Sequence, residues 1–569
     1  MKFFCILCVL CGFASAALAL EREAFIISKY DLEIRVEPEQ QRLGARGKIT
    51  LRNDSAHPQK IVALQISSSL NWRSIRVEGK AVQFVSQPYT SDIDHTGALS
   101  EAIVTLPLEI KPKDFVDLEI GYEGVIPLDT TRLTRVGIPE GIAKHTSWDQ
   151  ISPSFTAVRG AGYVAWYPIT TESADFSEGN SLFEVVDRWK AREAQAGMEI
   201  NLCAQFTEST VLRIVMNEPP RKNGSGGGYD HHTCSGYRFE TLGTVTPTFA
   251  IAEYVNQSKA PLNLDSLPGH EAGAATYSNA LEPAMKFVSG WFGQPSAEVT
   301  IADFADPNSA PFESGTLLMA SLAAEDSKLA GINLVHELVH SALPSSRPWV
   351  YEGLAHFAEA MYRQEQGGRQ AALDFLGLHR AAFLDSEKEV SAAPEKKVGQ
   401  PLAVTFDETY YRSKAAYVWW MLRDMAGDDA LKEAIRKYRA DDDNDKAPKY
   451  VEQLIEAAAK RDLGWFFDDW VYQDRGLPDF HVQSVHPWKT EKSVQFITVT
   501  LENLGNAGAE VPFTIFFEGG EITKRIEVRA TATATTRVEL PGTATKIVVN
   551  DGSVPEIDLT NNVFKISAP

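Results

Sequence analysis

The spacing of apolar residues changes twice along this chain of 569 residues, and that change limits the folds that it can adopt. Apolar and polar residues alternate with a period of two from about residue 30 to 126 and again in 199–215. The same alternation returns after Pro478, in 495–501 and in 546–549. A period of two is typical of antiparallel strands that bury one face. The chain is therefore expected to begin and to end in β-structure.

Between about residues 270 and 480 the spacing becomes that of amphipathic helices. A chain of this length exceeds what one hydrophobic core usually serves, so several domains are expected. We predict a multidomain α+β fold with a β-rich N-terminal domain in 20–255, a mainly helical domain in 256–480 and a C-terminal β-sandwich in 481–569. The helices are expected near 272–292, 329–343, 349–364, 370–385, 410–426, 428–439 and 449–458.

Residues 1–19 have the layout of a cleavable secretory signal peptide. Lys2 precedes an apolar run from Phe3 to Phe13, and small residues follow up to Ala19. The run is too short to span a bilayer, and no later stretch of about 20 uncharged apolar residues could do so. We therefore expect a secreted or periplasmic protein, exported by this signal and without stable membrane insertion after its cleavage. A retained membrane anchor is the alternative.

The cysteines agree with export. Three of the five lie in the signal segment, which leaves Cys203 and Cys234 as the pair in the mature chain. An oxidising compartment favours a disulfide between them. The alternative is two unlinked, buried thiols.

The charge of the chain argues against one class of partner. The formal net charge is −21 at pH 7, and both nucleic acids and anionic membrane surfaces would repel such a protein. We therefore expect no nucleic-acid partner. The oligomeric state stays open at this stage.

The segment Leu334–His340 places two histidines four residues apart. On a helix, His336 and His340 would share one face, one turn apart, so both imidazoles could reach one metal ion. A catalytic zinc ion takes three protein ligands and keeps a further position open for water, so a third ligand must come from elsewhere. Glu337 would lie beside the open position as the general base. These residues predict one Zn²⁺ per chain; the alternative is a pair of ordinary core histidines.

A second helix, expected shortly after the first, carries carboxylates. Glu352, His356 and Glu359 would lie on one face of it. The stretch Trp349–Glu359 resembles the third-ligand helix of the gluzincin peptidases, and of the alanyl aminopeptidase family in particular. The resemblance implies a thermolysin-like zinc catalytic domain with Glu352 as third ligand and Glu359 as acceptor for a ligand histidine. The connection after His340 is shorter than is usual in the family, and by spacing alone Glu359 would be the ligand.

Two further positions are similar to functional positions of that family. Lys414–Leu422 resembles a helix preceded by a tyrosine that donates a hydrogen bond to the oxyanion; here Arg412 stands at the tyrosine position and Tyr411 is one residue early. The resemblance implies Tyr411 as the oxyanion stabiliser, with Tyr410 as the alternative, unless both tyrosines only pack. The surroundings of Glu313 resemble the family's exopeptidase strand, which implies a pairing with the free α-amino group of the substrate. The alternative is a solvated loop carboxylate.

Together these features predict a secreted zinc metallopeptidase that hydrolyses peptide bonds in a peptide or protein substrate, acting as an aminopeptidase. Family members of full length carry a large helical domain after the small sandwich, and the chain ends before such a domain, so a more open cleft is expected. An endopeptidase of the same fold with an open cleft is the alternative within the enzyme class. A non-catalytic binding protein that retains the fold is the alternative outside it.

Overall fold

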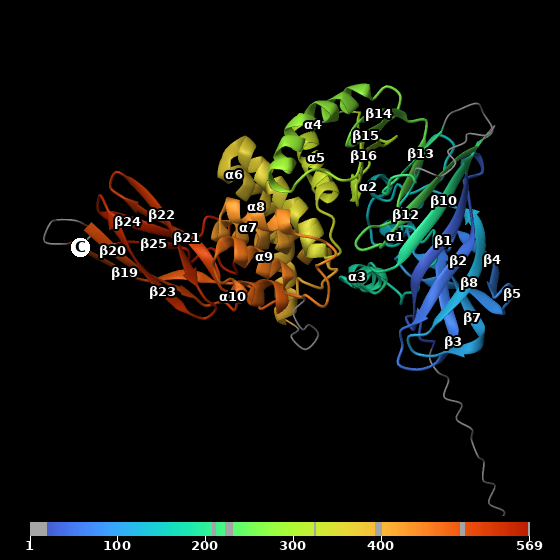
Figure 1. Cartoon of the computed structure of the whole chain (residues 1–569), viewed down its shortest axis with the longest axis horizontal. Coiled ribbons are helices and arrows are strands. Elements are labelled where there is room, and N and C mark those ends of the chain that lie inside the picture. Colours follow the sequence, from blue (N-terminus) through green and yellow to red (C-terminus); the bar gives the residue numbers. More distant parts are fainter. Residues whose placement is uncertain are drawn as a thin grey trace, which may run out of the picture.

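Three parts of the molecule follow one another along its longest axis (Figure 1). The computed structural model describes residues 20–206, 212–221, 232–323, 326–392, 401–489 and 495–566. In it, N-terminal β-sheets are followed by a helical region and then by C-terminal β-sheets. The expected multidomain α+β fold is thus confirmed. The proposed signal peptide, 1–19, lies outside the described residues, and the domain boundaries remain predictions.

The N-terminal part is built around a seven-stranded sheet in the order β12-β10-β1-β2-β8-β4-β5. Along β1 the residues alternate between buried and exposed, so that Leu32 and Ile34 are buried in the core of this part. The strands of the sheet are β1 (Phe25–Glu37), β2 (Arg42–Asn53), β4 (Leu70–Val77), β5 (Lys80–Ala81), β8 (Phe115–Val125), β10 (Gly197–Gln205) and β12 (His232–Phe239). A short 3-10 helix, η1 (Pro38–Gln40), connects β1 to β2.

Two three-stranded sheets complete the N-terminal part. They consist of β3 (Gln59–Ser67), β7 (Ala98–Ile110) and β6 (Phe84–Thr90), and of β11 (Arg213–Met216), β13 (Phe249–Ala252) and β9 (Thr156–Val158).

Strands β10 and β12 are covalently linked at the edge of the large sheet. Cys203 and Cys234 lie directly opposite each other in the antiparallel register and form a disulfide. The structure therefore joins the two cysteines that the sequence analysis paired.

Three helices in the N-terminal part were not anticipated by the sequence analysis: α1 (Thr131–Arg135), α2 (Glu140–Thr146) and α3 (Ser181–Glu193). Only α3 is long enough to show a helical period, and it buries Leu182, Val185 and Trp189. It lies in a segment otherwise dominated by strands.

The helical region begins on a five-stranded mixed sheet that the sequence analysis also did not anticipate. Its strands, in the order β14-β15-β16-β18-β17, are β14 (Val255–Lys259), β15 (Leu262–Ser266), β16 (Val299–Asp303), β17 (Phe312–Ser314) and β18 (Leu317–Ala320). β15, β16 and β18 run parallel, whereas β17 returns antiparallel to β18. Strands of three to five residues contain too few alternations for a period to be recognised from the sequence.

The long helices agree closely with the expected ranges. α6 contains a residue of non-helical conformation, Gly368 with φ of 80°, and this break separates the two helices that were expected in 349–364 and 370–385. The helical elements are α4 (Glu271–Trp291), α5 (Ser327–Ala342), α6 (Pro348–Ala392), α7 (Ala415–Ala426), α8 (Asp428–Lys437), α9 (Tyr450–Ala459) and α10 (Gly464–Phe467), with the π-helical turns η2 (Thr409–Lys414) and η3 (Asp468–Tyr472).

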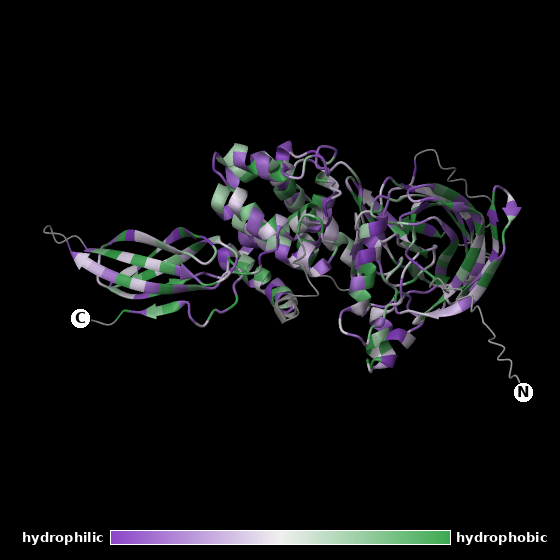
Figure 2. Ribbon diagram, turned by 90° about the horizontal axis from the view of Figure 1, so that it is seen from below, coloured by the Kyte–Doolittle hydropathy of each residue, from purple (hydrophilic) through white to green (hydrophobic). Residues whose placement is uncertain are grey.

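The C-terminal part is a sandwich of two antiparallel sheets, whose strands carry alternating hydrophilic and hydrophobic bands in Figure 2. The sheets have the orders β19-β20-β23 and β22-β21-β24-β25. Val499 and Ile515 are fully buried in a core that continues into the helical region, and Trp470 Nε1 donates a hydrogen bond to the carbonyl oxygen of Gly508 at 2.7 Å. The strands are β19 (Phe480–Lys489), β20 (Gln495–Asn503), β21 (Ala509–Phe517), β22 (Gly520–Val528), β23 (Thr533–Leu540), β24 (Ala544–Val549) and β25 (Val563–Lys565).

A buried lysine fixes the end of the π-helical turn η2. Lys414 is 0% exposed, and its Nζ lies 2.9 Å from Glu387 Oε1 and in contact with the carboxylate of Asp474. A buried charge is tolerated only when it is paired, so these contacts hold Lys414 and the turn before it in one place.

We expect Lys414→Met to lower the free energy of unfolding of the helical region by about 3–5 kcal/mol, because it leaves two neighbouring carboxylates buried without their cation. Urea unfolding followed by tryptophan fluorescence measures this change. Lys437→Met is the matched control, since Lys437 pairs with Glu433 on an exposed helix surface, and it should barely move the transition. Equal effects of the two substitutions would contradict the role given to Lys414.

Candidate metal centre

Helix α5 brings two histidines and a glutamate into the interior of the molecule. Asp326 caps the helix, since its side chain accepts a hydrogen bond from Lys328 N at 2.7 Å. His336 and His340 follow one turn apart, and their Nε2 atoms lie 3.0 Å from each other. Glu337 lies between them in sequence, and all three side chains belong to residues that are at most 3% exposed. Two ring nitrogens are therefore directed at one buried point.

Helix α6 supplies two carboxylates to the same centre. Glu352 Oε1 lies 3.7 Å from His340 Nε2, and its Oε2 lies 3.9 Å from His336 Nε2. Glu359 Oε1 lies 3.1 Å from the other ring nitrogen, His336 Nδ1. A hydrogen bond at Nδ1 orients the ring so that Nε2 is available to a metal. This arrangement favours Glu352 over Glu359 as the third ligand.

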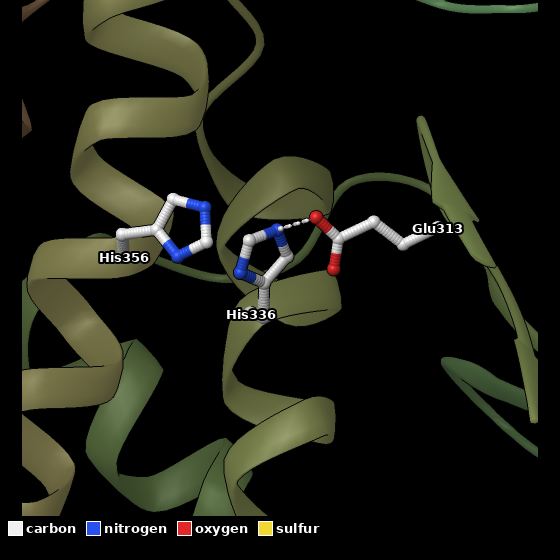
Figure 3. Close-up of side chains that lie close together, drawn as sticks. All are labelled: Glu313, His336 and His356. Atoms are coloured by element: carbon white, nitrogen blue, oxygen red, sulfur yellow. Dashed lines mark ion pairs between the residues drawn. The ribbon is translucent and has the colours of Figure 1, made fainter. Parts of the chain in front are cut away.

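Three overlapping clusters among the described residues could each hold a metal ion. Figure 3 shows one of them, in which Glu313 reaches from a strand toward His336, with His356 on the other side of that ring. The clusters consist of Glu313, His336 and His356; of His336, His340 and Glu352; and of His356, Glu359 and His379.

The cluster of His336, His340 and Glu352 is preferred, because it joins the two histidines of α5, whose Nε2 atoms lie 3.0 Å apart, to a carboxylate at 3.7 and 3.9 Å from them. In the third cluster, the two oxygens of Glu359 already contact His336 Nδ1 and His356 Nδ1, at 3.1 and 3.2 Å. Arg412 does not distinguish the other two clusters, since it faces Glu313 at 3.4 Å and Glu352 at 3.5 Å.

The donor atoms of the preferred cluster fit zinc. Two imidazole nitrogens and one carboxylate form a ligand set of catalytic zinc sites, which leave a further position open. Within the described residues, Glu352 Oε2 and both carboxylate oxygens of Glu337 are buried without a hydrogen-bond partner. Buried polar atoms without partners are unfavourable. A cation would satisfy Glu352, and a water molecule would satisfy Glu337.

Burial and neighbouring charges set the ionisation of the glutamates. Burial raises the pKa of Glu337 well above its usual range, and the negative charge of Glu313 adds to this effect. Although burial acts in the opposite direction, hydrogen bonds from His336 and His356 hold the pKa of Glu359 at about 2. Glu359 therefore stays ionised and keeps its role as acceptor.

Strand β17 is fixed by the N-terminal part on both sides of its central glutamate. The ring of Phe312 packs edge-on against Tyr163, with 5.4 Å between the ring centroids. Ser314 Oγ accepts a hydrogen bond from Thr246 N at 2.8 Å. Because side chains alternate along a strand, the residue between these two contacts points away from both of them.

That residue, Glu313, points toward the metal centre (Figure 3). Its Oε1 lies 3.3 Å from His336 Nε2 and 3.4 Å from Nη2 of Arg412. The side chain is 21% exposed, so it borders both the centre and solvent. Glu313 therefore lies on a held strand and not on a solvated loop.

The π-helical turn η2 presents three further residues. Tyr410 and Tyr411 are at most 1% exposed. Arg412 contacts the centre directly, since its Nε lies 3.5 Å from Glu352 Oε2. Turns of this kind within helices are frequent at functional sites. The sequence analysis gave Arg412 no role. The feature that could have indicated a role was its place at the position where the family has a tyrosine.

A cavity of approximately 410 Å³ lies beside the centre, a size suited to a small ligand or to the end of a peptide. Both the N-terminal part and the helical region line it. The sequence analysis did not identify the residues that the N-terminal part contributes. The lining includes Tyr163, Lys190 and Thr246 from the N-terminal part, and Glu352, His356 and Arg412 from the helical region.

A larger hollow of approximately 680 Å³ lies on the seven-stranded sheet. It is lined by charged pairs such as Arg42 with Glu123. None of the metal-binding clusters found among the described residues lies there. The smaller cavity is therefore the better candidate for a reaction site.

Comparisons with known proteins identify the fold. No family model matches this chain, and no curated protein matches its sequence. The solved structure of aminopeptidase A from Legionella pneumophila, in complex with aspartic acid, matches with a TM-score of 0.58 and 13% identity, covering 94% of this chain and 59% of that one. A mutant of an M1 zinc metallopeptidase from Deinococcus radiodurans, bound to a Tyr-Ser-Ala substrate, matches with a TM-score of 0.47 and 14% identity, covering 80% of this chain and 96% of that one.

The first of these matches shows that nearly the whole chain adopts the fold of aminopeptidase A, although the chain spans only 59% of the length of that protein. The second TM-score is too low to add to the argument. The expected resemblance to gluzincin aminopeptidases is thus confirmed at the level of the fold. Inside that fold, histidine and glutamate side chains form a cluster suited to a metal ion.

We expect the purified protein to bind one zinc ion per chain and to lose it in His340→Ala and Glu352→Ala, because each substitution removes a ligand. Glu359→Gln should keep zinc but bind it about 10–100-fold more weakly, since it loosens the orientation of His336. Elemental mass spectrometry after titration with a chelator measures both effects. His379→Ala is the control and should keep zinc. Loss of zinc from His379→Ala, together with retention of zinc in Glu352→Ala, would show that the metal binds in a different cluster from the proposed one.

Proposed function

We propose that this protein is a zinc-dependent peptidase that removes residues from the N-terminus of peptides. The observation that carries the proposal is the convergence of His336, His340 and Glu352 on one point, next to Glu337 and at the wall of a cavity. The fold shared with aminopeptidase A agrees with this class of reaction.

Glu337 is the proposed general base. When bound to His336, His340 and Glu352, one zinc ion per chain would act as a Lewis acid that polarises the scissile carbonyl and acidifies water. Glu337 takes a proton from the attacking water, whose oxygen forms a bond to the carbonyl carbon. When the carbon–nitrogen bond breaks, Glu337 returns the proton to the leaving amine. Its buried position next to His336 suits both transfers.

Two other residues would hold the substrate and the charge that develops on it. Glu313 pairs with the free α-amino group of the substrate. The α-amino nitrogen and the first carbonyl carbon of a peptide are only two bonds apart, so such a carboxylate has to lie close to the metal ligands, as Glu313 does at 3.3 Å from His336 Nε2. The oxyanion needs a hydrogen-bond donor, for which the sequence resemblance implies Tyr411 in the turn η2.

We also propose that the protein acts outside the cytoplasm on peptide or protein substrates. The disulfide between Cys203 and Cys234 supports an oxidising compartment, in line with the signal peptide expected in 1–19. Among the described residues, no helix is long and apolar enough to cross a membrane.

We expect Glu337→Gln to retain zinc and to lower kcat about 10²–10⁴-fold, because an amide cannot take the proton from water. Hydrolysis of aminoacyl amides, measured with zinc content on the same samples, tests this. Unchanged turnover would contradict the mechanism, and a zinc-loaded wild type that hydrolyses no peptide would favour the non-catalytic binding protein.

Substrate pairs with free and acetylated N-termini test the aminopeptidase assignment. We expect cleavage only at free N-termini in the wild type. Glu313→Gln should raise KM and reduce the preference for free over acetylated peptides, because the amide no longer compensates the ammonium charge. If the wild type cleaves both members of each pair equally, the protein is an endopeptidase of this fold.

A further inference from the structure

Arg412 places a cation at the wall of the cavity, beside the proposed metal centre. Its Nη2 lies 3.4 Å from Glu313 Oε1, and its Nε lies 3.5 Å from Glu352 Oε2. The guanidinium group therefore lies between the proposed amine-binding carboxylate and a proposed metal ligand. The side chain is 30% exposed and lines the cavity.

The N–H donors of Arg412 lie near the centre and remain available to a substrate. Both contacts are ion pairs at the long end of hydrogen-bond range, and Nε is a buried atom without a hydrogen-bond partner among the described residues. A guanidinium group carries five N–H donors in a planar fork, and it cannot lose its charge in a protein.

The backbone that carries Arg412 is anchored on both sides of the residue. Two residues later, the buried Lys414 is paired with Glu387 and Asp474. Ser413 Oγ lies 3.1 Å from His379 Nδ1 of helix α6. Donors on an anchored turn need little reorganisation when charge appears on a substrate, and this is the condition under which hydrogen-bond donors accelerate a reaction most.

The charge of the surroundings favours a cation over a neutral donor. Besides Glu337, which is protonated once water has attacked, the carboxylates of Glu313, Glu352 and Glu359 lie around the centre. An oxyanion that forms among them is opposed by their negative charge, which acts strongly in a buried site. A guanidinium group next to Glu313 and Glu352 offsets that charge, whereas a neutral hydroxyl offers only a dipole.

We propose that Arg412 is a catalytic residue, which donates a hydrogen bond to the carbonyl oxygen of the scissile peptide bond and stabilises the negative charge that this oxygen acquires. The inference rests on the proposed peptidase function. As the water oxygen bonds to the carbonyl carbon, the π-electron pair moves onto the carbonyl oxygen and an N–H of Arg412 holds it there. When the carbon–nitrogen bond breaks, the pair returns to form the carbonyl. Arg412 neither gains nor loses a proton.

Arg412→Gln tests this assignment with zinc-loaded protein. We expect kcat to fall about 10²–10³-fold while KM changes little, because the donor acts on the oxyanion and not on the bound substrate. Calorimetry should show a comparable loss of affinity for a phosphinic peptide, which carries anionic oxygens at a tetrahedral centre. Affinity for a reduced-amide analogue, which lacks the carbonyl oxygen, should stay the same. Zinc content should be unchanged.

Three further variants make the result decisive. Arg412→Lys keeps the charge and should recover part of kcat. Arg369→Gln is the matched control, since Arg369 pairs with Asp424 and Asp551 outside the cavity, and it should keep full activity. Tyr411→Phe tests the alternative that Tyr411 stabilises the oxyanion. We expect a smaller loss of kcat in Tyr411→Phe than in Arg412→Gln.

The opposite order, with Tyr411→Phe the more severe, would overturn the proposal, as would loss of zinc from Arg412→Gln or equal losses of affinity for the two analogues. Normal hydrolysis by Arg412→Gln would overturn the role of Arg412 alone. A zinc-loaded wild type that neither hydrolyses peptides nor binds the phosphinic peptide would overturn the peptidase function, and the role of Arg412 with it.

Discussion

Four glutamates crowd around two imidazoles in the interior of this protein, and that concentration of like charge governs the site. Glu337 and Glu352 are at most 4% exposed, so water does little to screen them. Carboxylates in such surroundings are stable only with cations or protons nearby. The geometry supplies a place for a divalent cation between His336, His340 and Glu352, and a guanidinium group at the edge. Both cations would offset the negative charge of the buried carboxylates.

The rest of the fold holds these charges in place. Helices α5 and α6 pack in a core that continues into the C-terminal sandwich. Lys414 fixes the turn η2 through a buried ion cluster. The N-terminal part fixes β17 through contacts with Phe312 and Ser314. The centre thus lies where elements from distant parts of the chain meet, and none of them could position it alone.

The sequence predicted those features that depend on local pattern. The helices α4 to α9 are long and periodic, so their existence and ranges followed from spacing. The motif around His336 did so as well, because two histidines one turn apart define a face. Spacing left the choice between Glu352 and Glu359 open. The structure favours Glu352, because Glu359 is occupied at His336 Nδ1.

The features that could not be predicted from the sequence depend on contacts between distant residues. The strands of the five-stranded sheet are too short to show a period, and their order depends on pairing between residues that are distant in sequence, such as Leu262 and Val299. Tyr163, Lys190 and Thr246 line the cavity only because the N-terminal part folds back against the helical region. In the sequence, Arg412 was recognisable only as a departure from the family's motif, which has a tyrosine at this position. Its contacts with Glu313 and Glu352 exist only in the folded chain, so no local pattern could reveal them.

The proposed reaction and its selectivity depend on different kinds of contact, local in one case and long-range in the other. Glu337 and the proposed metal ligands come from two consecutive helices, α5 and α6. Glu313, which would recognise the substrate amine, depends on contacts of its neighbours with Tyr163 and Thr246, far away in sequence. Under the proposed function, the position of cleavage therefore depends on the junction between the N-terminal part and the helical region.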